Sequence, residues 1–367
     1  MDDEQPAKRP SRRRQQPILV AIVYNVDFED ARAALDQSFE ARATVESVAM
    51  DVAAALESDG SHNATLVPMD GDFAELRMRL EASAPACVFN MCESLGGDAR
   101  LETAVPLMLE FLGIPYTGSD PDALSAALYK DRVKKRLVQA GVPTPGGLLV
   151  EHPTAACDLP FPLIVKPARE DGSAGIWTRS VVYDEASLRA RVQELISSFK
   201  APCLVEQFID GREFSVAMLG FPQARILPLQ EIDFTRLPTD QPRIVSYDAK
   251  WRAGSVEDLG TQPVMHPDLP SAVAARLRRA AAEAFRALGL RDYGRVDLRL
   301  STAGVPYVID VNPNCDLSPD AGFARAACSV GIDYTALMRL LVRYALRRKK
   351  GAGSARETRT ASSGEAR

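Results

Sequence analysis

The stretch YGRVDLRL, residues 293–300, is followed after a short turn by VPYVIDVN, residues 305–312. Both stretches are rich in apolar and β-branched residues, so we predict an antiparallel hairpin. Successive strand residues point to opposite faces, which puts Asp310 and Asn312 together on the face that Val311 does not share. An apolar strand therefore carries two oxygen-bearing side chains on one face, and this needs a physical reason.

The register of this hairpin sets charged side chains against each other. Counting back from the turn predicts three opposed pairs, which are Leu300 with Tyr307, Asp297 with Asp310, and Arg295 with Asn312. Two carboxylates that face one another repel, unless they share a proton or hold a cation between them. Two aspartates and an asparagine form an all-oxygen set, which suits Mg²⁺ or Mn²⁺ better than Zn²⁺. The alternative is an exposed sheet face on which both acids are merely solvated.

Composition is typical of a globular enzyme of two or three domains. The chain has 367 residues, of which 46% are hydrophobic and 25% charged, and its net charge is −5. This balance argues against a nucleic-acid partner. The one basic run, Lys8–Arg14, lies in a Pro- and Arg-rich segment that cannot build a core, so we predict a disordered basic arm over 1–16 rather than a targeting or nucleic-acid segment. We also predict a disordered tail over 348–367.

The chain shows no sign of a membrane span or a secretion signal. It has no run of about 18 apolar residues, and its N-terminus lacks an apolar segment. The six cysteines form no Cys-x-x-Cys pair, and the three histidines have no metal-ligand spacing. We therefore expect a cytoplasmic protein with reduced thiols, no membrane contact, and chemistry that does not depend on histidine.

Strands and helices alternate from residue 17 to 118, which predicts an open α/β domain. The strands are expected at 17–25, 63–69 and 85–91, and the helices at 30–58 and 72–83. Further strands are expected at 161–168, 202–209 and 212–220, and further helices at 119–141, 185–199, 269–288 and 333–347.

Three segments between these elements could contact a nucleotide. Lys166 ends an apolar strand and can hold a phosphate as a point charge, although a lysine there is often only solvated. The loop Asp171–Ile176 contains two glycines and could offer backbone N–H groups to a phosphate. The segment Val205–Glu213 could present its backbone to a flat base and Glu213 to a sugar, or it could be an ordinary turn at Asp210-Gly211.

Taken in order, these pieces resemble the ATP-grasp superfamily and, within it, the D-alanine–D-alanine ligase family. The resemblance runs from about residue 18 to residue 346. It is carried by the hairpin strands and by FLGIPYTGSD, FPLIVKPAREDGSAGI, LVEQFIDGREFSVAMLG and YDAKW. It implies an ATP-grasp fold of α/β and α+β class. An N-terminal open α/β (Rossmann-like) domain, 17–118, would precede two α+β subdomains, 119–212 and 213–347, that clamp ATP between them.

The resemblance also implies roles for individual positions. The residues implied to bind ATP are Lys130, Lys166, Ser173, Glu206, Gln207, Ile209 and Glu213. Lys250 and Arg295 are implied to act in catalysis, Lys250 on a phosphate and Arg295 on the oxyanion of the tetrahedral intermediate. Asp297, Asp310 and Asn312 are implied to bind two Mg²⁺ or Mn²⁺ ions.

The implied reaction joins a carboxylate to an amine. ATP phosphorylates the carboxylate, and the amine then displaces phosphate from the acyl phosphate. The partners would be small carboxylate and amine substrates such as amino acids or peptides, and a homodimer is possible because family members often form one.

The chain departs from the family pattern in four segments that would line the amino-acid pockets. These segments are 24–31, Asn90–Glu102, Gly172-Ser173 and Pro313–Phe323. We therefore expect a ligase whose substrates are not two D-alanines. Candidate contacts for an amino group are Glu93, Asp98 and Asp316, and Cys315 would either face the site or be a small buried hydrophobe.

Two alternatives remain open at this point. One is a true D-alanine–D-alanine ligase of cell-wall synthesis. The other is a nucleotide-binding regulatory protein that has lost catalysis.

Overall fold

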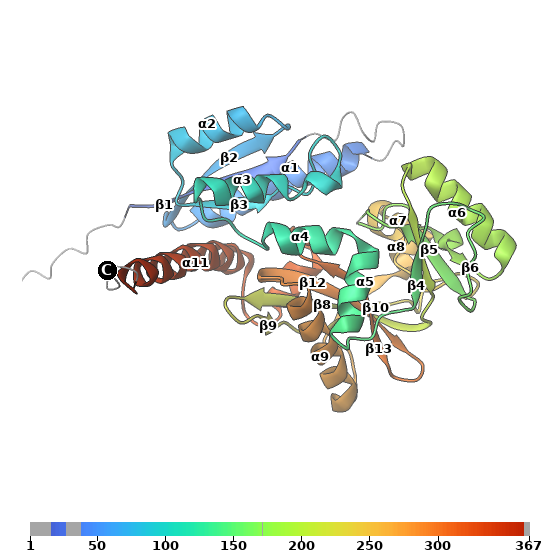
Figure 1. The fold of residues 1–367 in the computed structure, drawn as a ribbon. Helices are drawn as coiled ribbons and strands as arrows, with labels where there is room; N and C mark the ends of the chain where they lie inside the picture. The colour runs from blue at the N-terminus through green and yellow to red at the C-terminus, as the bar shows by residue number, and fades with distance from the viewer. Residues whose placement is uncertain (1–15, 27–37, 171, 363–367) are drawn as a thin grey trace, which may run out of the picture.

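The computed structural model describes residues 16–26, 38–170 and 172–362. Three sheets lie along the molecule, with the N-terminal sheet at one end and a four-stranded sheet at the other (Figure 1). Apart from Gln16, the predicted basic arm lies outside the described residues.

The N-terminal sheet is parallel, as predicted, with the strand order β2-β1-β3. Its strands are β1 (Ile18–Asn25), β2 (His62–Met69) and β3 (Cys87–Met91). The helices of this region are α1 (Ser38–Glu57), α2 (Phe73–Ser83), the short η2 (Ala99–Leu101) and α3 (Ala104–Leu112). The predicted beginning of the first helix, 30–37, lies outside the described residues. The carboxyl ends of β1 and β3 point toward the rest of the molecule, which is where ligands bind in open α/β sheets.

The central sheet is antiparallel with the strand order β4-β7-β5-β6. Its elements are β4 (Gly147–Val150), β5 (Leu163–Pro167), η3 (Thr178–Ser180), β6 (Val181–Val182), α6 (Glu185–Phe199) and β7 (Cys203–Gln207). Asp184 and Ser187 cap α6 reciprocally, so this helix begins where the sequence predicts it.

The C-terminal sheet has six strands and carries the predicted hairpin. Its strands are β8 (Gly211–Gly220), β9 (Arg225–Ile226), β10 (Gln230–Asp233), β11 (Gln262–Met265), β12 (Asp292–Ser301) and β13 (Pro306–Asn312). The helices of this part of the chain are α7 (Tyr247–Trp251), α8 (Val256–Gly260), α9 (Ser271–Ala287), α10 (Gly322–Cys328) and α11 (Tyr334–Ser362).

The helix predicted over 119–141 is two helices, α4 (Pro121–Leu128) and α5 (Lys130–Gln139). The backbone of Tyr129 between them is extended, which turns α5 away from α4. Both helices share a core with α9 and the C-terminal sheet. The assignment of 119–141 to the central subdomain stays a prediction, because α5 contacts both β4 of the central sheet and α9.

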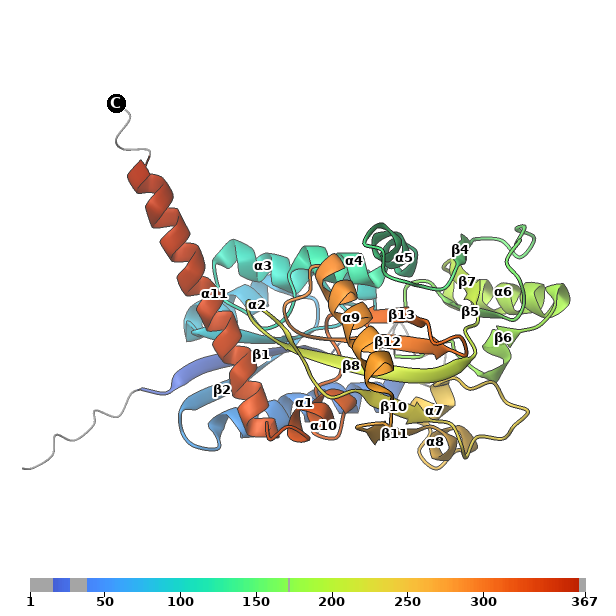
Figure 2. The same ribbon diagram turned by 90° about the horizontal axis from the view of Figure 1, so that it is seen from below.

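The C-terminal helix α11 returns to the N-terminal sheet and packs beside α1 (Figure 2). It continues to Ser362, so the tail predicted to be disordered from 348 is helical up to that residue, and only 363–367 lie outside the described residues. None of the helices among the described residues is both long and apolar enough to cross a membrane.

The hairpin of β12 and β13 contains a β-bulge at Ile309. At the end of the hairpin far from the turn the predicted register is confirmed, because Asp297 faces Asp310 and Arg295 faces Asn312. At the turn end it is wrong by one residue, since Leu300 pairs with Pro306 and not with Tyr307. The bulge absorbs this difference. The bulge also decides which side chains face the core: Val308 and Val311 both lie in it, while Asp310 and Asn312 face away.

Candidate active site

One face of the C-terminal sheet carries a two-dimensional array of charged and polar side chains. Strand pairing produces three rows across β8, β12 and β13. The rows are Glu213, Arg299 and Tyr307; then Ser215, Asp297 and Asp310; then Ala217, Arg295 and Asn312. Because successive rows are two residues apart, they lie about 6–7 Å from each other along the strands. The predicted metal ligands and the predicted ribose-binding acid therefore share one surface.

The two aspartates of the middle row are held by different partners. Asp297 accepts hydrogen bonds from Ser215 at 2.7 Å and from the Nε of Arg295 at 3.0 Å. Asp310 forms an ion pair with Lys130 at 3.4 Å. Burial would raise the pKa of Asp310, but Lys130, Lys166 and Arg295 outweigh it and hold that pKa below its usual value. The two aspartates therefore differ in their partners: Arg295 binds Asp297, and Lys130 binds Asp310.

The donor set of this face fits a divalent cation. Asp297 and Asp310 lie opposite each other, and the side chain of Asn312 lies on the same face. Within the part of the chain that the structure describes, no three His, Cys, Asp or Glu side chains gather as a metal site. The amide oxygen of Asn312 is therefore needed for a third ligand. Carboxylate and amide oxygens are hard ligands, which Mg²⁺ and Mn²⁺ prefer.

Two lysines form ion pairs with the buried carboxylate of Glu206, one at each oxygen. Lys166 lies 2.6 Å from Oε1, and Lys134 lies 2.5 Å from Oε2. Burial opposes the charge on Glu206, but the two lysines outweigh it and lower its pKa. Lys166 also donates to the carbonyl of Ile309, 3.3 Å away at the bulge, and thereby links the central sheet to the hairpin of β12 and β13.

Lys134 is a site residue that the sequence analysis missed. It lies one helical turn after Lys130 on α5, so both ammonium groups project from one side of the helix. Only 9% of its surface is exposed, and it also donates to Thr144 Oγ1 and to the carbonyl of Pro145. Its spacing from Lys130 was the available signal.

The segment after Glu206, which we predicted to be a hinge, joins β7 of the central sheet to β8 of the C-terminal sheet. The N–H of Gln207 donates to the carbonyl of Gly146 at 2.9 Å, and Ile209 is half-buried beyond it. Glu213 follows on β8 and forms an ion pair with Arg299 at 2.8 Å. Burial raises the pKa of Glu213, and Arg299 opposes that rise. The segment predicted to contact a base and a sugar thus borders the face that carries Asp297 and Asp310.

The loop that follows β5 is bonded to the segment that carries Lys250. Ser173 donates from Oγ to the carbonyl of Val245 at 3.0 Å, and the indole of Trp251 donates to the carbonyl of Gly172 at 2.8 Å. The N–H of Tyr247 donates to the carbonyl of Ile176 at 2.6 Å. These bonds bring Ser173 and Lys250, which were predicted on phosphates, to neighbouring segments.

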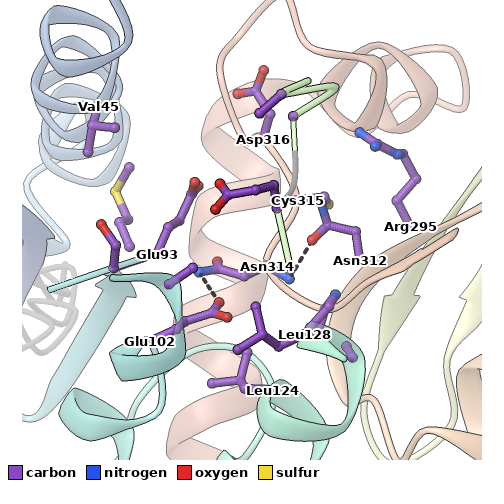
Figure 3. Close-up of a pocket in the computed structure, with 18 of the residues that line it drawn as sticks. Val45, Glu93, Glu102, Leu124, Leu128, Arg295, Asn312, Asn314, Cys315 and Asp316 are labelled. Atoms are coloured by element: carbon purple, nitrogen blue, oxygen red, sulfur yellow. Dashed lines mark hydrogen bonds between the residues drawn. The ribbon is translucent and has the colours of Figure 1, made fainter. Parts of the chain in front are cut away.

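A cavity of about 340 Å³ lies between the N-terminal region and this face. Arg295 and Asn312 line one part of it, while Leu124 and Leu128 of α4 form an apolar wall (Figure 3). Lys250 also lines the cavity. Carboxylates also line it: these are Glu93, Glu102, Glu170 and Asp316. Burial, followed by the nearby charge of Arg295, lowers the pKa of Lys250.

Asn314 joins the hairpin of β12 and β13 to the N-terminal region inside this cavity (Figure 3). Its N–H donates to the side-chain oxygen of Asn312 at 3.0 Å, and its amide donates to Glu102 at 3.2 Å and to the carbonyl of Cys92 at 3.3 Å. The hydroxyl of Tyr293 donates to its amide oxygen at 2.8 Å. Sequence reasoning placed this turn near the substrate but did not single out Asn314.

The candidate contacts for an amino group are divided by the structure. Glu93 and Asp316 line the cavity, as does the buried Cys315. Asp98 is not among the residues that line this cavity. Its carboxylate caps η2 and accepts a hydrogen bond from the guanidinium of Arg100 at 2.8 Å. Its expected role is therefore not supported.

Comparison with known proteins places this site in a family. A model of the D-ala D-ala ligase C-terminus matches residues 151–343. The D-alanine–D-alanine ligase of Desulforudis audaxviator is 33% identical over 81% of this chain and 92% of its own length. The chain belongs to the D-alanine–D-alanine ligase family. Members are ATP-dependent, ADP-forming carbon–nitrogen ligases of the ATP-grasp superfamily, and this enzyme is one of them.

Other relatives of this family member extend the picture. The uncharacterized protein y4sG of Sinorhizobium fredii is 36% identical over 74% of this chain and 78% of its own length. The structure of the D-alanine–D-alanine ligase of Bacillus anthracis complexed with ATP superposes with a TM-score of 0.68 at 20% identity, covering 92% of this chain and 100% of that chain. This likeness confirms the ATP-grasp fold. Family membership implies the use of ATP and a divalent metal.

Proposed function

We propose that this enzyme is an ATP- and Mg²⁺-dependent carboxylate–amine ligase that forms an amide bond through an acyl phosphate. The observation that carries the proposal is the pairing of Asp297 with Asp310 on a face that Lys130 and Lys166 flank. A bound cation would offset the negative charges of the two carboxylates, and a polyphosphate would offset the positive charges of the lysines.

Each predicted residue has a place in this proposal. Lys130, Lys166, Lys250 and the loop of Ser173 would hold the phosphates. Glu206 and the hinge at Gln207 and Ile209 would hold the base, and Glu213 the ribose. Asp297, Asp310 and Asn312 would bind two Mg²⁺ or Mn²⁺ ions, which offset the charge of the transferring phosphoryl group.

The reaction would proceed in two steps. A substrate carboxylate attacks the γ-phosphorus of ATP, and the bond to ADP breaks to leave an acyl phosphate. An amine then attacks the acyl carbon, loses a proton, and expels phosphate. Arg295 would donate to the oxyanion of the tetrahedral intermediate, a contribution worth about 2.7–4 kcal/mol for one such donor.

We further propose that the substrates are not two D-alanines. The support is chemical, because the lining of the cavity includes Glu93, Glu102 and Asp316 in segments that depart from the family pattern. The second candidate is D-alanine–D-alanine ligase activity itself, which the names of the relatives favour. The six free cysteines favour action in the cytoplasm, and a homodimer stays a prediction.

A coupled assay of ADP release separates these candidates. The purified enzyme, with Mg²⁺ and ATP, is screened against L- and D-amino acids, alone and in pairs. Stimulation by a pair other than D-alanine, with the matching dipeptide found by mass spectrometry, supports the proposal. Stimulation by D-alanine alone supports the second candidate. Asp297→Asn is the matched control, and release that survives this change would contradict catalysis at this site.

A further inference from the structure

Arg299 is a buried cation in the row of the sheet that also contains Glu213. It is 3% exposed, and its strand partner on β8 is Glu213 itself. The guanidinium donates from Nη1 to Oε2 of Glu213 at 2.8 Å. The two side chains are 4% and 12% exposed, so water screens this ion pair weakly. The ion pair uses Oε2 of Glu213.

The other donors of Arg299 hold main-chain segments that surround Glu213. Nη1 also donates to the carbonyl of Arg243 at 2.6 Å, and Nη2 donates to the carbonyl of Gly211 at 3.2 Å. The guanidinium lies over the ring of Phe208, 4.9 Å from its centre. One side chain thus fixes the hinge before Glu213 and the segment that leads to α7.

A purely stabilising role does not account for this arrangement well. A buried ion pair is often no more stable than a pair of apolar residues of similar volume, because both charges must leave water. The opposite face of β12 shows that apolar packing is available here, since Val296, Leu298 and Leu300 fill the core. A fork-shaped cation with fixed donors instead gives a carboxylate one orientation.

The position of the pair along the strand matches its expected ligand. Arg299 lies two residues from Asp297 and four from Arg295 on the same face, which places it about 6–7 Å beyond the row that contains Asp297 and Asp310. If the phosphates of ATP lie over that row, the ribose of the same nucleotide reaches the row of Glu213. This step rests on the proposed function of the site.

We propose that Arg299 is a positioning residue that aims the carboxylate of Glu213 at the ribose hydroxyls of ATP. Arg299 itself does not contact the nucleotide. Its effect is carried by the orientation of Glu213, so its loss changes the recognition of the sugar more than that of the base or phosphates.

The test compares the binding of two nucleotides and needs no knowledge of the amino-acid substrates. Dissociation constants for ATP and 2′,3′-dideoxy-ATP are measured by calorimetry with Mg²⁺ on the full chain. A hydrogen bond to a charged group corresponds to a preference for ATP of roughly tenfold or more. Glu213→Gln and Arg299→Met are each expected to reduce that preference to less than about threefold.

Two further variants keep the result interpretable. Arg212→Met removes an Arg–Glu pair from the same sheet, 2.6 Å from Glu231, on the face away from the site, and should leave the preference unchanged. If Arg299→Met does not fold, Arg299→Gln retains a donor without the charge or the fork, and it should still lower the preference at least about threefold.

The outcomes distinguish this inference from the function on which it rests. A wild-type protein that does not bind ATP overturns the proposed function. A wild-type protein that binds ATP with a clear sugar preference, together with Arg299 variants that keep that preference, overturns the positioning role alone. A wild-type preference that Glu213→Gln does not reduce also overturns it, because Arg299 would then act on no sugar contact.

Discussion

Asp297 and Asp310 face each other across β12 and β13. Two carboxylates in this position repel each other, and a cation bound between them would lower that repulsion. We predict that Asp310→Asn raises the Mg²⁺ concentration for half-maximal ADP release at least about tenfold and lowers the maximal rate about 100-fold. A Mg²⁺ titration of ADP release measures both effects. An unchanged Mg²⁺ requirement would contradict the assignment of Asp310 as a ligand.

Lys134 shares the buried carboxylate of Glu206 with Lys166. Lys134→Met leaves that carboxylate with one cation, so we predict a loss of about 1–3 kcal/mol in the free energy of unfolding, less than for an entirely unpaired buried charge. Urea denaturation followed by circular dichroism measures it. The neighbouring Lys135 is the control, because its side chain is 75% exposed and its pair with Asp131 is a surface pair. Lys135→Met should change the stability by less than about 0.5 kcal/mol. Equal losses of stability in both variants would show that the ion pair between Lys134 and Glu206 adds nothing to the stability beyond a surface pair.

Cys315 lines the cavity, and its buried surroundings disfavour the reactive thiolate. Burial raises its pKa to about 12, although Arg295 opposes the rise. At pH 8 only about one thiol in 10,000 would then be ionised, and the thiolate is the reactive form. We predict that iodoacetamide at pH 8 modifies the exposed Cys328 and spares Cys315, as peptide mass spectrometry would show. Rapid labelling of Cys315 in the folded protein would refute this.

Asn314 connects the metal-binding hairpin to Cys92 and Glu102 of the N-terminal region. Asn314→Ala removes both bonds and leaves the hydroxyl of Tyr293 without this acceptor. We predict a loss of about 1–3 kcal/mol of stability and faster amide hydrogen exchange over residues 92–102. Asn63→Ala, at an exposed position of β2, should change neither quantity. Exchange that stays at the wild-type rate in the Asn314 variant would argue against the link.

Local patterns in the sequence predicted most of the elements and the register at the end of the hairpin that carries Asp310 and Asn312. Alternation identified the face that these two residues share. The bulge at Ile309 escaped prediction, because its carbonyl is held by Lys166, which is 143 residues away in the chain. A contact of that kind leaves no trace in local periodicity.

Several site residues were missed for the same reason. In the sequence, Arg299 is one of several charged residues on a strand. Only the pairing of β12 with β8 shows that Glu213 lies opposite it. The packing of α4 and α5 against the C-terminal sheet likewise depends on tertiary contacts with α9. The resemblance to a family supplied the nucleotide contacts that the residues alone left open.

The bonds between the loop at Gly172–Ile176 and the segment at Val245–Trp251 have a consequence for how the site operates. The loop belongs to the central sheet, whereas the segment carrying Lys250 belongs to the C-terminal one. Three hydrogen bonds join them, so either one can withdraw alone only by breaking those bonds. If Lys250 binds a phosphate as we propose, opening of the loop and withdrawal of the Lys250 charge would be coupled. On the proposed function, the same bonds would help to keep water away from a reactive acyl phosphate.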